Sequence, residues 1–218
     1  MVAEAIVYAA DNGARIINLS LGGRGLTTIE KLAVDHARSK GAILVVAAGN
    51  NAADVSGYSP SGLDGVITVA ATDRRDRRAP FSNWGPSIDI AAPGVDVLSL
   101  RARNTDLLSF IRNVKYEIGE GIVGDDRAYY RASGTSFAAP IVSGTLSVLL
   151  SRSPNLTAEE ARRMVLNSAR DIETPGIDNY TGYGILDATA ALSANPETFV
   201  ESRIGGVKVT QNGGKTVL

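Results

Sequence analysis

Short apolar runs bounded by glycine are the feature that most restricts how this 218-residue chain can fold. The three longest are RIINLSL at Arg15–Leu21, AILVVAA at Ala42–Ala48 and GVITVAA at Gly65–Ala71. Their nearly continuous β-branched character is typical of strands that are buried on both faces. Segments with helical periodicity, Met1–Ala10 and Thr27–Ser39, precede the first two runs. This alternation predicts an α/β fold with three layers, in which a mostly parallel sheet is flanked by helices.

The C-terminal third predicts two more helices and a hairpin. Thr157 and Glu160 have the spacing of a capping box, which indicates that a helix begins there and continues through Ser168. A final helix is expected over Leu186–Leu192, and Gly206–Val217 alternates around an Asn-Gly turn. We therefore expect one domain over residues 1–195 and a β-hairpin tail, or the start of a further module, over residues 196–218.

Composition excludes several classes of function. The chain is 44% hydrophobic and 21% charged with a formal net charge of -1, so no overall field favours nucleic acid or an anionic membrane. Its one basic run, Asp73–Arg78, is interrupted by two aspartates, which favours a solvated loop. The chain has no cysteine, no apolar run long enough to span a bilayer and no signal-peptide pattern at its N-terminus.

One serine stands where a helix is expected to begin. In the segment GTSFAAP, Ser136 is followed by an apolar stretch, and Pro140 is expected in the first helical turn. Unpaired N–H groups at a helix N-terminus stabilise negative charge on a substrate carbonyl. The alternative is that Ser136 or Thr135 is only an N-cap. A nucleophile elbow of the G-x-S-x-G type is set aside, because that fold needs a histidine after the serine and His36 precedes it.

Five ordered blocks resemble the subtilisin-like serine proteases, the subtilases of peptidase family S8. They are IINLSLGG from Ile16, AILVVAAGN from Ala42, VITVAATD from Val66, FSNWGPSIDIAAPG from Phe81 and GTSFAAP from Gly134. The resemblance covers the C-terminal two-thirds of such a catalytic domain, from the first helix to about Leu192. It implies a serine endopeptidase that cleaves a polypeptide substrate through an acyl-enzyme.

The resemblance also implies roles for individual residues. Ser136 resembles the nucleophile, and Asn50 resembles the side-chain donor of the oxyanion hole, although taken alone Asn50 reads as a turn residue. Two segments resemble those that line the specificity pocket and pair with the substrate, with strand-end turns as the alternative. They are Ser20, Leu21, Gly22 and Gly23 in the first, and Ala47, Ala48 and Gly49 in the second.

The sequence departs from the family pattern at the other two members of the triad. Neither D-[ST]-G nor H-G-[TS] occurs, and His36 is expected in the middle of a helix, where it would not serve as the base. We therefore expect the N-terminal strands of the sheet to be missing, and the aspartate and histidine to come from an N-terminal segment or a partner chain. An uncovered Arg15–Leu21 strand would otherwise favour self-association, and this chain alone would be inactive. The competing hypothesis is a non-catalytic module that binds peptides through the same scaffold.

A second departure is an insertion over about residues 101–131. Its composition is that of a surface loop or lid, and its acids give only a weak indication of structural calcium, so no cofactor is expected. The resemblance implies an extracellular or cell-envelope location.

Overall fold

The computed structural model describes residues 1–101, 122–124, 128–195, 200–204, 207–212 and 215–217. Its helices are α1 (Val2–Asp11), α2 (Thr28–Ser39), the short 3₁₀ helix η1 (Val55–Gly57), α3 (Thr135–Arg152), α4 (Ala158–Asn167) and α5 (Ala188–Ser193). Its strands up to residue 100 are β1 (Ile16–Leu19), β2 (Gly23–Arg24), β3 (Ile43–Ala47), β4 (Tyr58–Ser59), β5 (Ile67–Thr72), β6 (Ile90–Pro93) and β7 (Val97–Leu100). The later strands are β8 (Ile122–Val123), β9 (Tyr129–Ala132), β10 (Val200–Ile204), β11 (Val207–Asn212) and β12 (Lys215–Val217).

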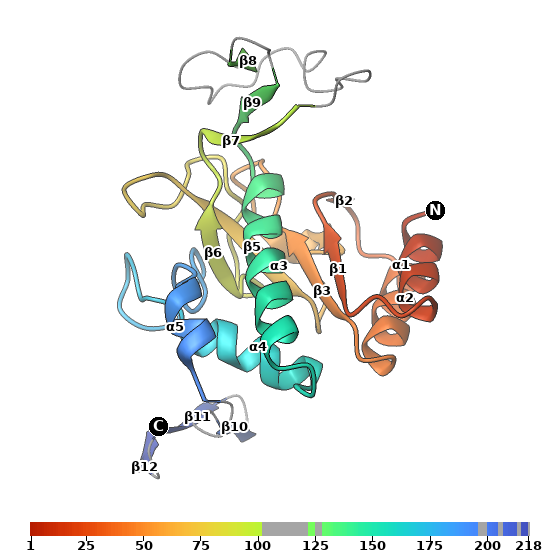
Figure 1. The fold of residues 1–218 in the computed structure, drawn as a ribbon, viewed down its shortest axis with the longest axis vertical. Coiled ribbons are helices and arrows are strands. Elements are labelled where there is room, and N and C mark those ends of the chain that lie inside the picture. Colours follow the sequence, from red (N-terminus) through yellow and green to blue (C-terminus); the bar gives the residue numbers. More distant parts are fainter. Residues whose placement is uncertain (102–121, 125–127, 196–199, 205–206, 213–214, 218) are drawn as a thin grey trace.

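The main sheet has the strand order β1-β3-β5-β6, and every pair in it is parallel (Figure 1). All residues of β3 and β5 are buried, as their continuous apolar sequences predicted. Parallel strands point their carboxyl ends toward the same edge of a sheet. The loops after β1, β3, β5 and β6 therefore begin along one edge, which we call the carboxyl edge.

Helices cover both faces of this sheet, so the predicted three-layer α/β fold is confirmed. Along β3, Ile43, Val45 and Ala47 belong to a core shared with α3, α4 and α5, whereas Leu44 and Val46 belong to a core shared with α1 and α2. Successive side chains of a strand point to opposite faces, and that alternation separates the two cores. In Figure 1, α3 crosses the front of the sheet while α1 and α2 lie to the right.

The expectation that Arg15–Leu21 is buried on both faces is wrong in part. β1 is an edge strand that pairs only with β3 within the described sheet, and its Asn18 is exposed while Ile17 and Leu19 are buried. Successive side chains of β1 point to opposite faces: Ile17 and Leu19 enter the core shared with α1 and α2, whereas Asn18 lies on the other face and accepts a hydrogen bond from Ser143 of α3. The row of unpaired backbone groups along the open flank of β1 remains available for another strand.

Helix boundaries follow the local signals closely. Gly13 takes a positive φ of 83° after α1, and the Thr27 hydroxyl accepts a hydrogen bond from the Glu30 N–H at the start of α2. The capping box of Thr157 and Glu160 is formed as predicted, and α4 begins with it. The last helix begins two residues later than expected, because the Asp187 side chain caps it.

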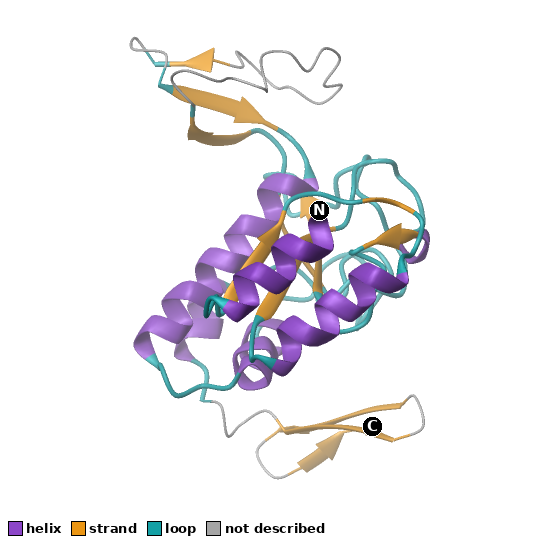
Figure 2. Cartoon of the chain, turned by 90° about the vertical axis from the view of Figure 1, so that its right-hand side faces the viewer, coloured by secondary structure: helices purple, strands orange, loops and turns teal. Residues whose placement is uncertain are grey.

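The expected insertion loop over residues 101–131 is partly a strand. Its end forms β9, which pairs in antiparallel fashion with β7 on one side and β8 on the other. Figure 2 shows this small sheet beyond the N-terminal end of α3, apart from the main sheet. Residues 102–121 and 125–127 lie outside the described residues. They include the acidic residues of the expected loop, so the indication of calcium falls outside the described residues; these acids are Asp106, Glu117, Glu120, Asp125 and Asp126.

β11 and β12 form an antiparallel pair, as the predicted hairpin requires, and the turn residues 213 and 214 lie outside the described residues. β11 ends at Asn212 and pairs with β12, and β10 pairs with the other side of β11. No helix among the described residues combines the length and the apolar character needed to cross a bilayer.

Candidate active site

Ser136 is the second residue of α3, and its side chain does not cap that helix. The N-cap position is occupied by Gly134, and the helix start has no side-chain cap. The Ser136 hydroxyl instead donates to the backbone carbonyl of Ser20, just beyond β1, over 3.3 Å. The alternative that Ser136 is only an N-cap is therefore excluded, because its hydroxyl points away from the helix backbone.

Pro140 explains a second contact between the same two residues. It is the sixth residue of α3 and so lies in the second turn, not in the first turn as the sequence had indicated. Because proline has no N–H, the carbonyl four residues earlier, that of Ser136, receives no helical hydrogen bond. The Ser20 hydroxyl donates to this carbonyl at 2.8 Å. The serine pair thus holds the start of α3 against the carboxyl edge.

Asn50 lies at the carboxyl edge three residues after β3, and its side chain reaches the start of α3. Its Oδ1 accepts hydrogen bonds from the Thr135 N–H at 2.8 Å and from the Thr135 hydroxyl at 3.0 Å. These partners are 85 residues away along the chain, so the side chain does not act as a local turn cap. The Asn50 side chain is therefore bonded to the residue that directly precedes Ser136 in the chain.

Two further residues complete this junction: Thr135, which the sequence suggested only as a possible N-cap, and Gly134, which it gave no separate role. Thr135 is fully buried, and its hydroxyl oxygen also accepts the Gly49 N–H at 3.0 Å. Gly134 brings its backbone so close that a Cβ there would lie 3.3 Å from the Asn50 Nδ2. Both belong to the GTS motif, and their small or hydroxylated side chains were the available signal.

The predicted substrate segment Ser20–Gly23 is exposed and mostly open. Its last residue, Gly23, begins β2 and pairs with Ser59 of β4. Leu21 and Gly22 make no backbone hydrogen bond with any described residue, and both are exposed. An extended peptide could add to this stretch through its own backbone groups.

The second predicted segment, Ala47–Gly49, has no N–H left for a peptide strand in its last two residues. The Ala48 N–H donates to the Val69 carbonyl and the Gly49 N–H to the Thr135 hydroxyl. The expectation that these residues pair with substrate is therefore wrong for the N–H groups of Ala48 and Gly49, because both already have acceptors within the protein. The segment could still line a pocket with its surface.

His36 lies away from this junction. It belongs to the last turn of α2, which leads into the amino end of β3, whereas Ser136 contacts the carboxyl edge. Its Nε2 is 2.8 Å from Asp11 Oδ1, and this hydrogen bond holds the pKa of the Asp11 carboxyl below its ordinary value. The histidine therefore joins α2 to the end of α1 and offers no base to Ser136.

A cavity of about 760 Å³ lies at the opposite edge of the sheet, where the parallel strands begin and which we call the amino edge, and not beside Ser136. It is lined by the first residues of β3 and β5 and by the start of α4, among them Ile43, Ile67, Glu159 and Arg162. The described part of the chain holds no group of three or more acidic, histidine or cysteine side chains suited to a metal ion. The candidate site is thus the junction of Ser20, Asn50, Thr135 and Ser136.

Comparison with known proteins agrees with this geometry. The model of the subtilase family of peptidases matches residues 1–184. Fervidolysin from Fervidobacterium pennivorans is 38% identical over 194 residues, which cover 88% of this chain and 27% of the relative. A thermophilic serine proteinase from a Bacillus species is 38% identical over 192 residues, covering 88% of this chain and 41% of the relative. The chain therefore spans well under half the length of these two relatives.

Solved structures have the same fold. The crystal structure of fervidolysin superposes with a TM-score of 0.76 at 35% identity, over 92% of this chain and 30% of that one. Relatives from Xanthomonas campestris and Natrialba magadii are named extracellular proteases. With a family match over most of its length, and with the predicted nucleophile and oxyanion segments joined at one helix start, this chain belongs to the subtilase family.

Proposed function

We propose that the protein carrying this chain is a serine endopeptidase that cleaves polypeptides through an acyl-enzyme on Ser136. The observation that carries the proposal is the bond pair from Thr135 to Asn50 Oδ1, because it places the Asn50 amide beside the start of α3. The oxygen of that amide is occupied, so its NH₂ group is the part left to donate. A fixed donor beside a nucleophile at a helix N-terminus suits a developing oxyanion.

In the proposed reaction, Ser136 Oγ attacks the scissile carbonyl carbon while its proton passes to a base. The negative charge that forms on the carbonyl oxygen is stabilised by the Ser136 N–H and by the Asn50 NH₂ group. Collapse of this intermediate breaks the C–N bond, and the leaving amine takes the proton. Water then attacks the ester and regenerates the Ser136 hydroxyl. In the structure this hydroxyl donates to the Ser20 carbonyl, so it must turn toward the base before it reacts.

The base is proposed to come from outside the sequence given. His36 is at the amino edge of the sheet and paired with Asp11, so it does not serve Ser136. We expect an aspartate and a histidine on an N-terminal segment or a partner chain that adds a strand to the open flank of β1. A location outside the cell is proposed from the names of the relatives.

Covalent labelling tests this function. A fluorophosphonate probe should label the 218-residue chain very slowly, because a serine hydroxyl without a base is a poor nucleophile. Adding the polypeptide that supplies the aspartate and histidine should give rapid labelling, and Ser136→Ala should abolish it. Light scattering of the same samples should show self-association that disappears when the added strand covers β1. Rapid labelling of the chain alone, as a monomer, would contradict the proposed source of the base.

A second candidate is a non-catalytic module that binds peptides. The observation in its favour is that the Ser136 hydroxyl is bonded to the Ser20 carbonyl and faces no titratable base among the described residues. The two candidates differ in one result. The module would bind peptides along Ser20–Gly22 equally well with Ser136 or with Ser136→Ala, and neither form would be labelled when the missing polypeptide is added.

A further inference from the structure

The basic loop Asp73–Arg78 lies at the carboxyl edge, and backbone hydrogen bonds connect it to the start of α3. It begins directly after Thr72, whose carbonyl accepts the Gly94 N–H at 2.9 Å. The Gly94 carbonyl in turn accepts the Gly134 N–H at 2.7 Å, two residues before Ser136. Two backbone hydrogen bonds thus connect the base of the loop to the start of α3.

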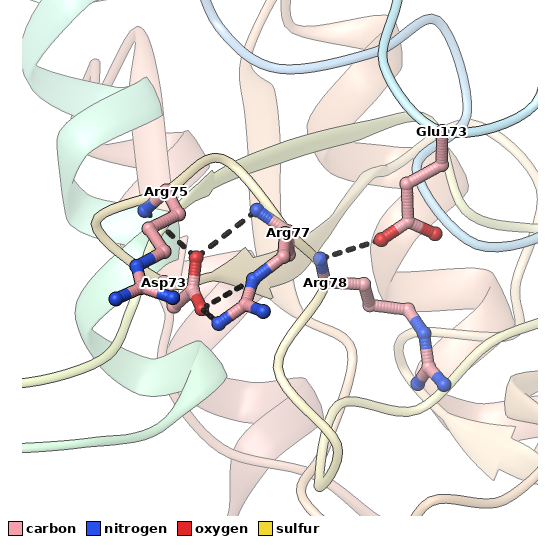
Figure 3. Close-up of polar contacts among 5 residues, drawn as sticks. All are labelled: Asp73, Arg75, Arg77, Arg78 and Glu173. Atoms are coloured by element: carbon pink, nitrogen blue, oxygen red, sulfur yellow. Dashed lines mark hydrogen bonds and ion pairs between the residues drawn. The ribbon is translucent and has the colours of Figure 1, made fainter.

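Both carboxylates of the loop already have partners within the protein. Asp73 Oδ1 accepts the N–H groups of Arg75 and Arg77, and its Oδ2 accepts the Arg77 guanidinium at 2.7 and 3.1 Å (Figure 3). Burial raises the pKa of Asp73, but its bonds to Arg77 outweigh that effect and hold the pKa below its ordinary value. Asp76 pairs with the Arg170 guanidinium at 2.6 Å. The acids therefore fix the shape of the loop.

The neighbouring acid and one more arginine are also engaged. Glu173 accepts the Arg78 backbone N–H at 2.7 Å (Figure 3). The Arg78 guanidinium donates to the Ser82 carbonyl and lies over the Tyr180 ring, 5.1 Å from its centroid. The guanidinium groups of both Arg77 and Arg78 therefore already have partners within the protein.

Arg74 and Arg75 are different. Both are exposed, and neither guanidinium has a carboxylate, carbonyl or ring partner among the described residues. The dashed lines of Figure 3 reach only the backbone N–H of Arg75 and not its guanidinium. Hydrogen bonds and an ion pair already fix the backbone of this loop. Binding of an anion by the two unpaired guanidinium groups therefore costs little further backbone entropy.

We infer that Arg74 and Arg75 bind acidic side chains of the polypeptide substrate on the leaving-group side of the scissile bond. This inference rests on the proposed function. Along the carboxyl edge the open Ser20–Gly22 stretch follows β1, Asn50 follows β3 and the basic loop follows β5, with Ser136 lying against Ser20. A peptide whose acyl part adds to Ser20–Gly22 has its leaving part carried past β3 toward β5. The favoured substrates are therefore acidic just after the cleaved bond.

The test uses peptides that differ only in the second and third residues after the scissile bond, either aspartate and glutamate or asparagine and glutamine. With the complete active protein, kcat/KM should favour the acidic peptide about 3- to 10-fold, the range expected for two exposed ion pairs. The preference should fall in high salt and vanish in the double variant Arg74→Gln, Arg75→Gln. Arg152→Gln removes one positive charge at the far end of α3 and should leave the preference intact.

A binding experiment distinguishes failure of this inference from failure of the proposed function. Fluorescence anisotropy of the same peptides with the full chain carrying Ser136→Ala should show tighter binding of the acidic peptide, and the double variant should lose that difference. If Ser136 is never labelled yet the charge-dependent binding is found, the proposed function fails and the basic loop still binds acidic peptides. Equal binding of both peptides, or a preference for acids on the acyl side, would overturn the inference.

Discussion

Asn50 Oδ1 accepts two hydrogen bonds from Thr135, one from its N–H at 2.8 Å and one from its hydroxyl at 3.0 Å. The same hydroxyl oxygen accepts the Gly49 N–H. These three bonds join the end of β3 to the start of α3 and determine which end of the Asn50 amide can face a substrate. The asparagine is therefore a structural acceptor and a proposed catalytic donor at once.

The two roles of Asn50 can be separated by substitution. Asn50→Asp keeps an oxygen for Thr135 but removes the NH₂ donor, so turnover should fall by about 100-fold or more while thermal stability stays near that of the wild type. Asn50→Ala removes both groups and should lose turnover to a similar degree. It should also lose about 1–3 kcal/mol of unfolding free energy, because the Thr135 N–H is left without its acceptor. Steady-state kinetics and thermal denaturation of both variants check this. Normal turnover in Asn50→Asp would show that Asn50 is only structural.

Gly49 should not tolerate a side chain. It has a φ of +102°, and a Cβ there would come within 2.4 Å of the Nδ2 of Asn83, a buried residue bonded to the Ala48 carbonyl. Gly49→Ala should therefore lose about 1–3 kcal/mol of unfolding free energy through strain and displacement of Asn83. Gly144→Ala is the matched control, because that helical position has open space and should gain about 0.5–1 kcal/mol. Equal stability of the two variants in urea denaturation would contradict the close contact.

His36 should be dispensable for catalysis. It pairs with Asp11 at the opposite edge of the sheet, so His36→Ala should leave kcat/KM and the rate of Ser136 labelling unchanged in the complete enzyme. A small loss of stability is expected, because the contact between α1 and α2 is weakened. Labelling of this variant beside Ser136→Ala is the decisive comparison. A large loss of labelling with intact folding would assign His36 the role of base.

Asp73 should make stability depend on pH in the acid range. Its folded-state pKa lies below the ordinary value of 3.8, so its carboxylate stabilises the fold above that pH and the contribution is lost as the pH falls through the lowered pKa. The difference in unfolding free energy between the wild type and Asp73→Asn should therefore be constant near neutral pH and shrink below about pH 4. Urea denaturation across pH 3 to 7 measures it. Adding Arg77→Gln should remove most of the difference, and a difference that grows on acidification would contradict the assigned contact.

Local sequence signals determined most of the elements of this protein. The glycine-bounded apolar runs predicted β3 and β5, and the Thr157 and Glu160 pair predicted the start of α4, because burial of continuous apolar runs and helix capping depend on neighbouring residues. The ordered motifs were sufficient to indicate the family. These properties need no knowledge of distant parts of the chain.

Tertiary structure alone decided which residues meet. The exposure of Asn18 depends on how far the neighbouring helices cover each face of β1, and no property of the strand's own sequence contains that information. The bonds from Ser20 to Ser136 and from Asn50 to Thr135 span 116 and 85 residues. They exist because a parallel sheet gathers its carboxyl ends at one edge and α3 begins there. The sequence by itself identified the chemical groups, whereas packing decided that the Asn50 side chain bonds to Thr135 at the start of α3 and that His36 pairs with Asp11.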